Sequence, residues 1–342
     1  MANEGKPVKR KNNIVSALFL MCAVVMLPSV NSAAPYYEGK RISIVVGFPP
    51  GGGYDRMARL LQKHLPKYIP GKPTIIVENM DGAGTIVAAN YIYNIAKPDG
   101  LTIGTFSKGL PASQLVKAPG VKFDIRKFAW IGSSAVEATV LCLRSDLPYK
   151  TVDDIRKTIK PIYMLGAGPA SVDQQFPTLL KEYAGLNFKI VQYPSSAAGM
   201  IAIEQGELDG RAGSYSAFRP FIERGLVRPM IRGRVSEPDI EKLPVNEDLT
   251  SNPRGKTVMG MLSIQDKAGR PYAAPPGTPP EVMNILKEAF SKFAKDPEAT
   301  EEAKKVLMTV DYVPPEECMK IFHFILEQPE DITNEFKKYI NF

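Results

Sequence analysis

The sequence has few of the residues that most catalytic and metal-binding sites require. Its 342 residues include three cysteines, two histidines and one tryptophan. Three cysteines are too few for the disulfide scaffold that holds many small secreted domains together. His64 and His323 lie far apart in the chain, and no H-E-x-x-H, C-x-x-C or G-x-S-x-G motif occurs. We therefore expect no metal site and no cofactor, and the motifs do not support an enzyme.

Long apolar segments and blocks of basic residues are also lacking. The longest uncharged apolar segment, residues 17–27, falls well short of the roughly 20 residues that span a bilayer. Beyond residue 34, no block of five or six basic residues and no alternation of basic with aromatic residues marks a nucleic-acid surface. The net charge of +7 is mild. We expect no nucleic-acid partner, and the charge at most fits acidic ligands.

The N-terminus has the layout of a secretory signal peptide. Four basic residues between positions 6 and 11 precede the apolar segment, and Pro28 and several small residues follow it. Residues 1–33 are therefore predicted to be a cleaved signal peptide, with cleavage before Ala33 or before Ala34 left open. An uncleaved membrane anchor is the disfavoured alternative, because the apolar segment is too short. The mature chain is predicted to be periplasmic.

Residues 41–65 predict an anion-binding turn between a strand and a helix. A β-branched run, residues 42–46, is typical of a buried strand, and apolar residues recur at helical spacing from Met57 to Tyr68. Gly51, Gly52 and Gly53 lie between them and let the backbone approach a ligand closely. A helix N-terminus carries about half a positive charge, so this turn favours a carboxylate or phosphate.

Strand-like and helix-like segments alternate along the chain, which is typical of parallel βαβ units. About 310 residues after cleavage are more than one core usually serves, so we expect two domains. The end of the chain is predicted to be nearly all helical. Expected strands are 41–48, 74–78, 102–106, 140–143, 162–165, 188–192 and 208–213; expected helices are 84–96, 152–158, 171–183, 199–205, 280–295, 298–307 and 316–327.

A second glycine-bearing turn, residues 166–171, also joins an apolar strand to a helix. Ligands of open α/β sheets bind beyond the carboxyl ends of the strands, so two such turns in different domains would hold a small anion between them. Ser171 is a candidate ligand group, although a helix N-cap is the more common role of such a serine. Asp55 is open to the same two interpretations.

Six segments in register resemble one family. Residues 48–61, FPPGGGYDRMARLL, resemble the FPPGG-x-x-D-x-x-AR-x-L segment of the periplasmic receptors of tripartite tricarboxylate transporters, the TctC or Bug-type solute-binding proteins. The match extends over essentially the whole mature chain. The other segments are 77–84 (VEN-x-x-GAG), 97–102 (P-D-G-x-T), 166–173 (the second Gly/Ser loop), 205–210 (G-x-x-D) and 274–281 (AP-x-GTP-x-E).

The resemblance implies a type II periplasmic-binding-protein fold, in which two α/β domains joined by a strand hinge close around one ligand. Domain 1 is expected to comprise 34–140 and 263–342, and domain 2 to comprise 141–262. The chain is expected to cross outward near 138–143 and back near 259–264. The implied ligand is a small organic carboxylate, and the implied partners are the large and small integral membrane subunits of a transporter. We expect a monomer.

The resemblance and the turns together give the candidate ligand-binding residues. Tyr54 and Ala170 depart from the family pattern, which has a small Ser or Thr and commonly a Gly at these positions. Arg211, Arg219 and Lys108 are candidates for pairing with a distal carboxylate, against the alternative of a solvated surface position. The candidates are Phe48, Pro49, Gly51, Gly52, Gly53, Tyr54, Asp55, Lys108, Gly168, Ala170, Ser171, Tyr193, Arg211 and Tyr215, where each tyrosine has ordinary packing as its alternative.

Some questions stay open at this point. Cys142 and Cys318 remain in the mature chain, and their pairing is undecided, although the apolar neighbours of Cys142 favour a buried core thiol. A sensory role, in which the ligand-bound protein signals to a receptor, is the main functional alternative to transport. An exported α/β enzyme acting on an organic acid is a more distant one.

Overall fold

The computed structural model describes residues 1–5, 34–168 and 171–339. Most of the predicted signal peptide, residues 6–33, and the candidate residue Ala170 lie outside the described residues. The chain divides into two compact units, Met1–Ala34 and Pro35–Phe342, and the second unit contains the whole α/β structure. Nowhere in the described ranges is there a helix long and apolar enough to cross a membrane.

The first sheet has five strands, in the order β2-β1-β3-β10-β4. Strands β1, β2 and β3 are mutually parallel, whereas β10 is antiparallel to both of its neighbours. The strands are β1 (Arg41–Val46), β2 (Thr74–Asn79), β3 (Thr102–Thr105), β4 (Ala129–Ser133) and β10 (Pro271–Ala274). These strands and the helices that cover them form the first half of the protein.

The second sheet repeats this arrangement, in the order β7-β6-β8-β5-β9. Here β6 is parallel to β7 and β8, and β5 is antiparallel to both β8 and β9. The strands are β5 (Thr139–Arg144), β6 (Ile162–Gly166), β7 (Phe188–Gln192), β8 (Gly210–Ser214) and β9 (Val227–Arg232). In each sheet, one antiparallel strand connects directly to the other half of the protein. These elements form the second half.

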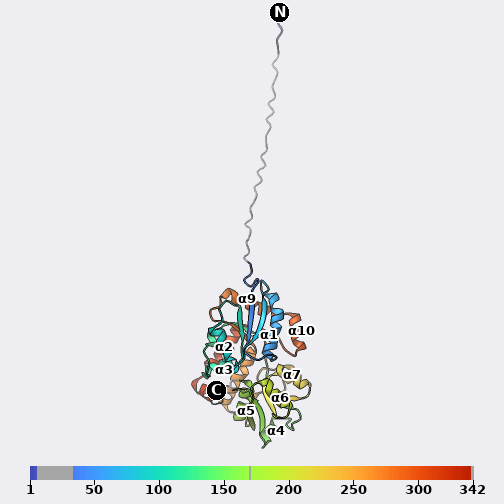
Figure 1. Ribbon diagram of the computed structural model, residues 1–342, viewed down its shortest axis with the longest axis vertical. Helices are drawn as coiled ribbons and strands as arrows, with labels where there is room; N and C mark the ends of the chain where they lie inside the picture. The colour runs from blue at the N-terminus through green and yellow to red at the C-terminus, as the bar shows by residue number, and fades with distance from the viewer. Residues whose placement is uncertain (6–33, 169–170, 340–342) are drawn as a thin grey trace. The chain divides into compact units, whose positions relative to one another are not determined.

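Helices cover both faces of each sheet (Figure 1). On the first sheet, α1 (Gly53–His64), α9 (Pro280–Phe293) and α10 (Pro297–Lys305) share one core, and α2 (Ile86–Asn94), α3 (Leu110–Leu115) and α11 (Pro315–Leu326) share another. On the second sheet, α6 (Ser196–Glu204) and α7 (Tyr215–Glu223) lie opposite α4 (Val152–Lys157), α5 (Val172–Ala184), α8 (Pro253–Ile264) and α12 (Glu330–Tyr339). The α2/α3/α11 core continues without a break into the α5/α8/α12 core.

Two short segments connect the two sheets, and they lie side by side. Residues 134–138 link β4 to β5, and the 3-10 helix η6 (Gln265–Ala268) with residues 269–270 leads back into β10. They run antiparallel, because Glu137 N–H donates to Asp266 O at 2.9 Å and Gly269 N–H donates to Ala135 O at 3.0 Å. We call residues 134–138 and 265–270 the crossing segments. The return crossing lies later than predicted, since 259–264 belong to α8.

The strand register places both glycine turns beside the crossing segments, at the junction between the two halves. Tyr272, just after the return crossing, pairs with Thr105 at the end of β3. Thr139, just after the outward crossing, pairs with Ser214 at the end of β8. The carboxyl ends of the parallel strands in both sheets therefore face the crossing segments. The turns after β1 and β6 follow those ends, which is where α/β sheets bind ligands.

The expected alternation of strands and helices is confirmed wherever it was predicted, with shifts of a few residues at the ends. Three strands were not predicted from the sequence. β4, with the sequence AWIGS, was overlooked although it contains tryptophan and isoleucine, and the other two have weak β signals, since β10 has the sequence PYAA and β9 contains Pro229. β9 tolerates this proline because it is an edge strand, where one N–H is not needed for pairing. Cys142 is a buried free thiol, as its apolar neighbours predicted, and Cys318 is also buried and unpaired.

The described chain after β10 is helical, as predicted, but its last helix does not lie on the first sheet. α12 packs against α5 and α8 of the second half, whereas α11 packs against β4 and α3 of the first half. The C-terminal helices therefore span the two halves, rather than all rejoining the first.

Candidate functional site

The N-terminus of α1 is open, because no side chain caps it. Its N-cap residue is Gly52, with φ −75° and ψ 172°, and no side chain accepts a hydrogen bond from the first turn at this position. The first N–H groups of a helix have no partner within the helix. Together with the helix dipole, these groups form a site that attracts an anion. Gly51 and Gly52 are exposed and lie next to this end.

Asp55 shapes this turn from inside and is not free to meet a ligand. Its carboxylate is 2 % exposed and accepts hydrogen bonds from Gly51 N–H at 2.8 Å, from Arg59 and from the amide of Asn79. Although burial alone would raise the pKa of Asp55, these three donors hold it below its usual range. Gly51 has a φ of +86°, a conformation that favours glycine. The interpretation of Asp55 as the N-cap was wrong, because Gly52 holds that position; the contacts of Asp55 instead hold the turn in shape.

Tyr54 and Phe48 connect the first turn to the crossing segments. Their rings stack with centroids 4.2 Å apart. The Tyr54 hydroxyl donates to Gly269 O at 2.8 Å and accepts from Lys108 N–H at 3.1 Å. Burial raises the pKa of Tyr54, so its hydroxyl stays protonated at neutral pH. Pro49, also a candidate residue, is exposed on the same turn.

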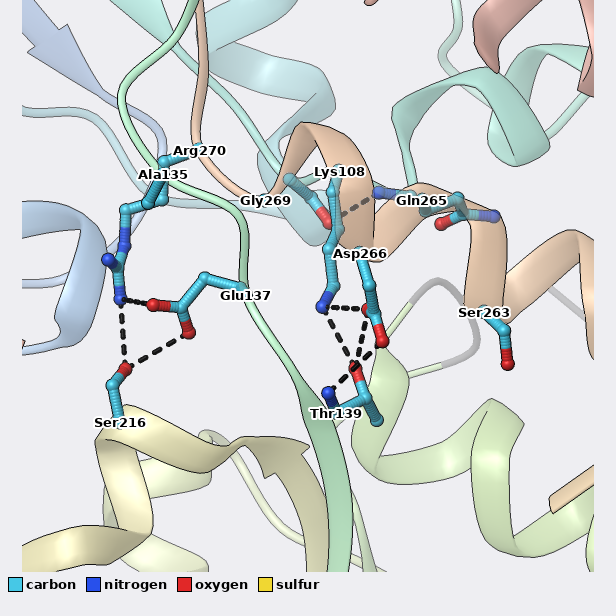
Figure 2. Close-up of polar contacts among 12 residues, drawn as sticks. Lys108, Ala135, Glu137, Thr139, Ser216, Ser263, Gln265, Asp266, Gly269 and Arg270 are labelled. Carbon is cyan, nitrogen blue, oxygen red and sulfur yellow. Dashed lines mark hydrogen bonds and ion pairs between the residues drawn. The ribbon is translucent and has the colours of Figure 1, made fainter. Parts of the chain in front are cut away.

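A buried ion pair lies between the two halves, beside the first turn. Arg270 on the return crossing pairs through Nη2 with Glu137 on the outward crossing at 2.8 Å, and both side chains are 1 % exposed. Ser216, from α7, donates to Glu137 Oε2 and accepts from Arg270 Nη2, each at 3.0 Å. Figure 2 shows the three side chains converging. Both crossing segments and the second half therefore meet at one polar cluster.

A second buried ion pair lies on the other side of the outward crossing (Figure 2). Lys108, from the turn after β3, pairs with Asp266 of η6, and its Nζ donates to Thr139 Oγ1 at 2.9 Å. Thr139 begins β5, so the cluster connects both halves and the return crossing. Burial raises the pKa of Asp266, although Lys108 and Thr139 favour its charged form. Lys108 is 4 % exposed, so the alternative of a solvated lysine was wrong.

The second glycine turn differs from the first, because its helix is capped. Ser171 Oγ accepts from Gln174 N–H at 3.3 Å and donates to Gly168 O at 2.7 Å. The interpretation of Ser171 as an N-cap therefore fits its contacts. A cavity of about 10 Å³, lined in part by Thr139, Val172 and Gln265, places the start of α5 beside the second ion pair. Of the candidate residues in this turn, Gly168 has a φ of +95°.

Arg211 is held inside the second half. It lies on β8, where its Nε pairs with Asp173 at 2.9 Å and its Nη1 donates to Ser196 O at 2.9 Å. The expected alternative of a solvated arginine on a helix was therefore wrong. Burial raises the pKa of Asp173, against the opposing effects of Arg211 and Ser196. The pair fastens the first turn of α5 to the middle of the sheet.

The remaining candidates are engaged with the second half. Tyr193 donates to Glu207 at 2.9 Å, and Tyr215, at the start of α7, is 3 % exposed and donates to Asp239 at 3.3 Å. Arg219 pairs with Glu237 at 2.7 Å. These contacts fit the packing roles that the sequence left open for the tyrosines.

Sequence reasoning missed the polar residues of the crossing segments. Glu137 and Arg270 form one ion pair between the halves, and Asp266 forms the other with Lys108; Ser216 and Thr139 are their hydrogen-bond partners. A signal was present, because the run QDKAGR at 265–270 puts charged residues between two apolar segments near the expected return crossing. Placing that crossing inside α8 removed these residues from consideration.

One cluster has the composition of a metal site but already contains a cation. Single ligand atoms of His64, Asp296 and Glu298 lie within 4.8 Å of one another. The Lys67 ammonium pairs with Asp296 at 2.5 Å and with Glu298 at 3.1 Å, which supplies the positive charge that these carboxylates need. The cluster is therefore an ion-pair network between α1, η1 (Leu65–Tyr68) and α10.

Two three-layered α/β halves, joined by two crossing segments and with their glycine turns at the junction, define the class of bilobal solute-binding proteins. Solved structures agree: the periplasmic binding protein BugD matches with a TM-score of 0.71 and 22 % identity, over 89 % of this chain and 98 % of its own. MatC from Rhodopseudomonas palustris, solved with bound malate, matches with a TM-score of 0.65 and 18 % identity, over 88 % of this chain and 99 % of its own.

Relatives in sequence give the family. A UPF0065 protein of Bordetella pertussis is 27 % identical, over 82 % of this chain and 85 % of its own length. The model of the TctC family, the tripartite tricarboxylate transporter family receptors, matches residues 57–334. The chain belongs to the TctC family. The family and the type of fold that the six segments predicted are therefore confirmed.

Proposed function

We propose that this protein captures a small organic carboxylate between its two halves and delivers it to a tripartite tricarboxylate-type transporter. The observation that carries the proposal is the uncapped N-terminus of α1 at the junction, next to Gly51 and Gly52. An exposed helix N-terminus with free N–H groups recognises a carboxylate without any charged side chain. Membership of a family of transporter receptors and the malate bound to MatC support the same ligand class.

The candidate residues of the two turns have different parts in this proposal. Gly52, Gly53 and Tyr54 would present N–H groups to the carboxylate, while Phe48, Pro49, Gly51 and Asp55 hold the first turn in shape, since Gly51 N–H already donates to Asp55. Gly168, Ala170 and Ser171 would close on the ligand from the second half. Lys108, Arg211, Tyr193 and Tyr215 would support these turns through the contacts described above, since each already has a protein partner.

The same proposal includes location and motion. Residues 1–33 would be removed on export, so that the mature protein works as a monomer in the periplasm with the large and small membrane subunits as partners. The moving bodies would be the two halves, which follow the predicted 34–140 with 263–342 and 141–262 except that the return crossing lies at 265–270 and α12 packs on the second half. A ligand closes such a protein only through its higher affinity for the closed state.

Thermal unfolding of residues 34–342 with a panel of organic acids, amino acids, sugars and nucleotides tests the ligand class. A ligand that binds only the native state raises the melting temperature. A selective shift with carboxylates is the expected result. If no acid raised the melting temperature and a sugar or nucleotide did, the proposal would be overturned.

Gly52→Val tests the placement of the site. A Cβ at Gly52 would meet only Pro49 O at 3.9 Å, so the fold should accept the change while the valine covers the start of α1. We expect carboxylate affinity to fall by about 10- to 100-fold, the loss of one or two charge-assisted hydrogen bonds. Gly260→Val is the matched control, because a Cβ there meets only Glu247 at 4.0 Å, on α8. Equal affinities for both variants would place the site elsewhere.

Delivery to a transporter has its own test. Vesicles with the large and small membrane subunits should take up the labelled carboxylate only when the liganded protein is present. A protein that serves a sensory receptor would bind the same carboxylate and leave uptake unchanged.

A further inference from the structure

Arg270 is a buried arginine with half of its hydrogen-bonding capacity unused. The side chain is 1 % exposed, and only Nη2 has partners, namely Glu137 and Ser216. Nε and Nη1 are buried and have no hydrogen-bond partner among the described residues. Buried polar atoms are nearly always paired, so two unpaired guanidinium nitrogens point to a group that occupies this place in another state.

The guanidinium of Arg270 lies beside Gly53, at the open end of α1. A Cβ built on Gly53, the first residue of α1, would come within 2.9 Å of Arg270 Nη2 and 3.8 Å of Nε. The Cα–Cβ direction in a helix is tilted toward the N-terminus, so the guanidinium lies on the side of Gly53 toward which the free N–H groups point. In Figure 2 one nitrogen of Arg270 points away from Glu137 and Ser216, toward the pale blue ribbon.

The charges around this end favour an additional anion. Arg56, in the first turn of α1, has its pKa lowered first by burial and then by the neighbouring positive charge of Arg270. Glu137 neutralises Arg270, but no carboxylate of the described residues contacts Nε or Nη1. A ligand carboxylate at the start of α1 would meet the helix dipole and two guanidinium donors together.

We propose that Arg270 is a ligand-binding residue, whose Nε and Nη1 donate to the carboxylate that the N-terminus of α1 holds. The inference rests on the proposed function and narrows it: recognition requires an ionised carboxylate, and the corresponding amide is rejected. Gly53 is required at its position because any side chain there would displace the guanidinium. Protein atoms cover both nitrogens in this structure, so ligand binding requires those atoms to move apart.

A purely structural role for Arg270, as a clamp between the crossing segments, makes opposite predictions. If the Arg270–Glu137 pair only holds the halves together, losing either charge should weaken ligand binding to the same extent. If Arg270 also binds the carboxylate, removing Glu137 leaves a stronger positive charge at the site. Glu137→Gln should then bind carboxylates at least as tightly as the wild type, while Arg270→Gln should lose affinity.

The experiment measures dissociation constants of the mature protein for malate, succinate, adipate, citrate and benzoate, each with its amide, by calorimetry. We expect binding of at least one acid without its amide, about a tenfold or greater loss in Arg270→Gln, and no loss in Glu137→Gln. The double variant Arg270→Gln/Glu137→Gln has no buried unpaired charge, so it keeps the test valid if a single variant fails to fold. It should show the same loss as Arg270→Gln.

Three results would overturn the inference. Unchanged affinity in Arg270→Gln or in the double variant would make Arg270 a structural residue only. Equal losses in the two single variants with recovery in the double variant would show a clamp. If the wild type bound none of the acids, the proposed function would be overturned, and the inference with it. The first two results would leave the proposed function intact.

Discussion

The two glycine turns look alike in sequence and differ in what satisfies their helices. Both follow a parallel strand at the junction, and both lead into a helix of 12 or 13 residues. The second helix, α5, is capped by Ser171, whereas the first, α1, has Gly52 in the same position and no cap. A helix end that the protein leaves unsatisfied at a junction is available to an external anion. We therefore propose the first turn as the main anchor for a ligand.

The acidic residue in the first turn of each helix shows a second difference. Asp55 pairs with Arg59, whose side chain is 49 % exposed, whereas Asp173 pairs with Arg211, whose side chain is 11 % exposed. The pKa of Asp55 lies below its usual range and that of Asp173 lies above it. The charged carboxylate at the start of α1 is thus stabilised by a half-exposed partner, whereas the carboxylate at the start of α5 depends on a buried partner.

The largest expected effect is a loss of stability when the buried ion pair at the second turn is removed. Arg211→Met leaves the Asp173 carboxylate buried without its partner and should lower the free energy of unfolding by about 3–5 kcal/mol. Arg59→Met is the matched change at the first turn and should lower it by about 0.5 kcal/mol, because Arg59 is half exposed and Asp55 keeps Gly51 and Asn79. Urea unfolding measures both, and equal losses would contradict the distinction.

The next largest effect is expected from a substitution that gives α1 a side-chain cap like that of α5. Gly52→Ser introduces a side chain that can cap α1, since Gly52 already has extended backbone angles and free space. We expect a gain of a few tenths of a kcal/mol in stability, with carboxylate affinity reduced about tenfold, because the serine oxygen takes an N–H from the ligand. A variant that becomes more stable and binds equally well would show that these N–H groups are not used.

Removing the cap of the second turn should lower the stability of the protein and leave its carboxylate affinity almost unchanged. Ser171→Ala deletes the hydrogen bond to Gln174 N–H and should lower the free energy of unfolding by about 1 kcal/mol. Carboxylate affinity should change by less than about threefold, since the Ser171 hydroxyl is engaged within its own turn. A large loss of affinity without a loss of stability would make Ser171 a ligand group.

The smallest expected effect is the change in stability with pH that the ionisation of Asp55 causes. Its folded pKa lies below the unfolded value of about 3.9, so its ionised form stabilises the protein above that value and the benefit is lost as the pH falls through the folded pKa. The stability difference between the wild type and Asp55→Asn should stay constant from pH 7 to about 5 and narrow below about 4. Chemical unfolding across this range measures it, and a constant difference down to pH 3 would disagree.

The raised pKa of Asp173 has the opposite sign. Its contribution is most favourable below the unfolded pKa of about 3.9 and falls as the pH rises toward the folded value. A carbon NMR titration of the two carboxyl groups should therefore give a lower midpoint for Asp55 than for Asp173. The reverse order would contradict the difference in their surroundings.

Local signals in the sequence were enough for the alternating elements, because each depends on residues close in the chain. Residues 41–65 predicted β1, the open turn and α1 from hydrophobic spacing and three glycines. Strands β10 and β9 were missed because PYAA has little β propensity and a proline interrupts VRPMIR. β4 (AWIGS) was missed although its residues favour a strand, and all three strands pair with partners that are distant in sequence or antiparallel to the expected units.

The polar junction could not be predicted from the sequence in the same way. Arg270 meets Glu137 from a distant part of the chain, and Lys108 meets Asp266 across 158 positions of sequence. Nothing local distinguishes these buried charges from surface ones. Lys108 and Arg211 were predicted as candidates for pairing with a ligand carboxylate, and in the structure both pair with carboxylates of the protein that only the folded arrangement brings near.

The placement of β10 has a consequence for how the chain acquires its structure. This strand lies between β3 and β4, although the entire second sheet separates it from both in sequence. The first sheet therefore stays divided until residue 274 is available, while every strand of the second sheet lies within residues 139–232. Closing such a distant pairing is slow compared with local contacts. The second sheet can assemble first, and the sheet that leads into the open turn is completed last.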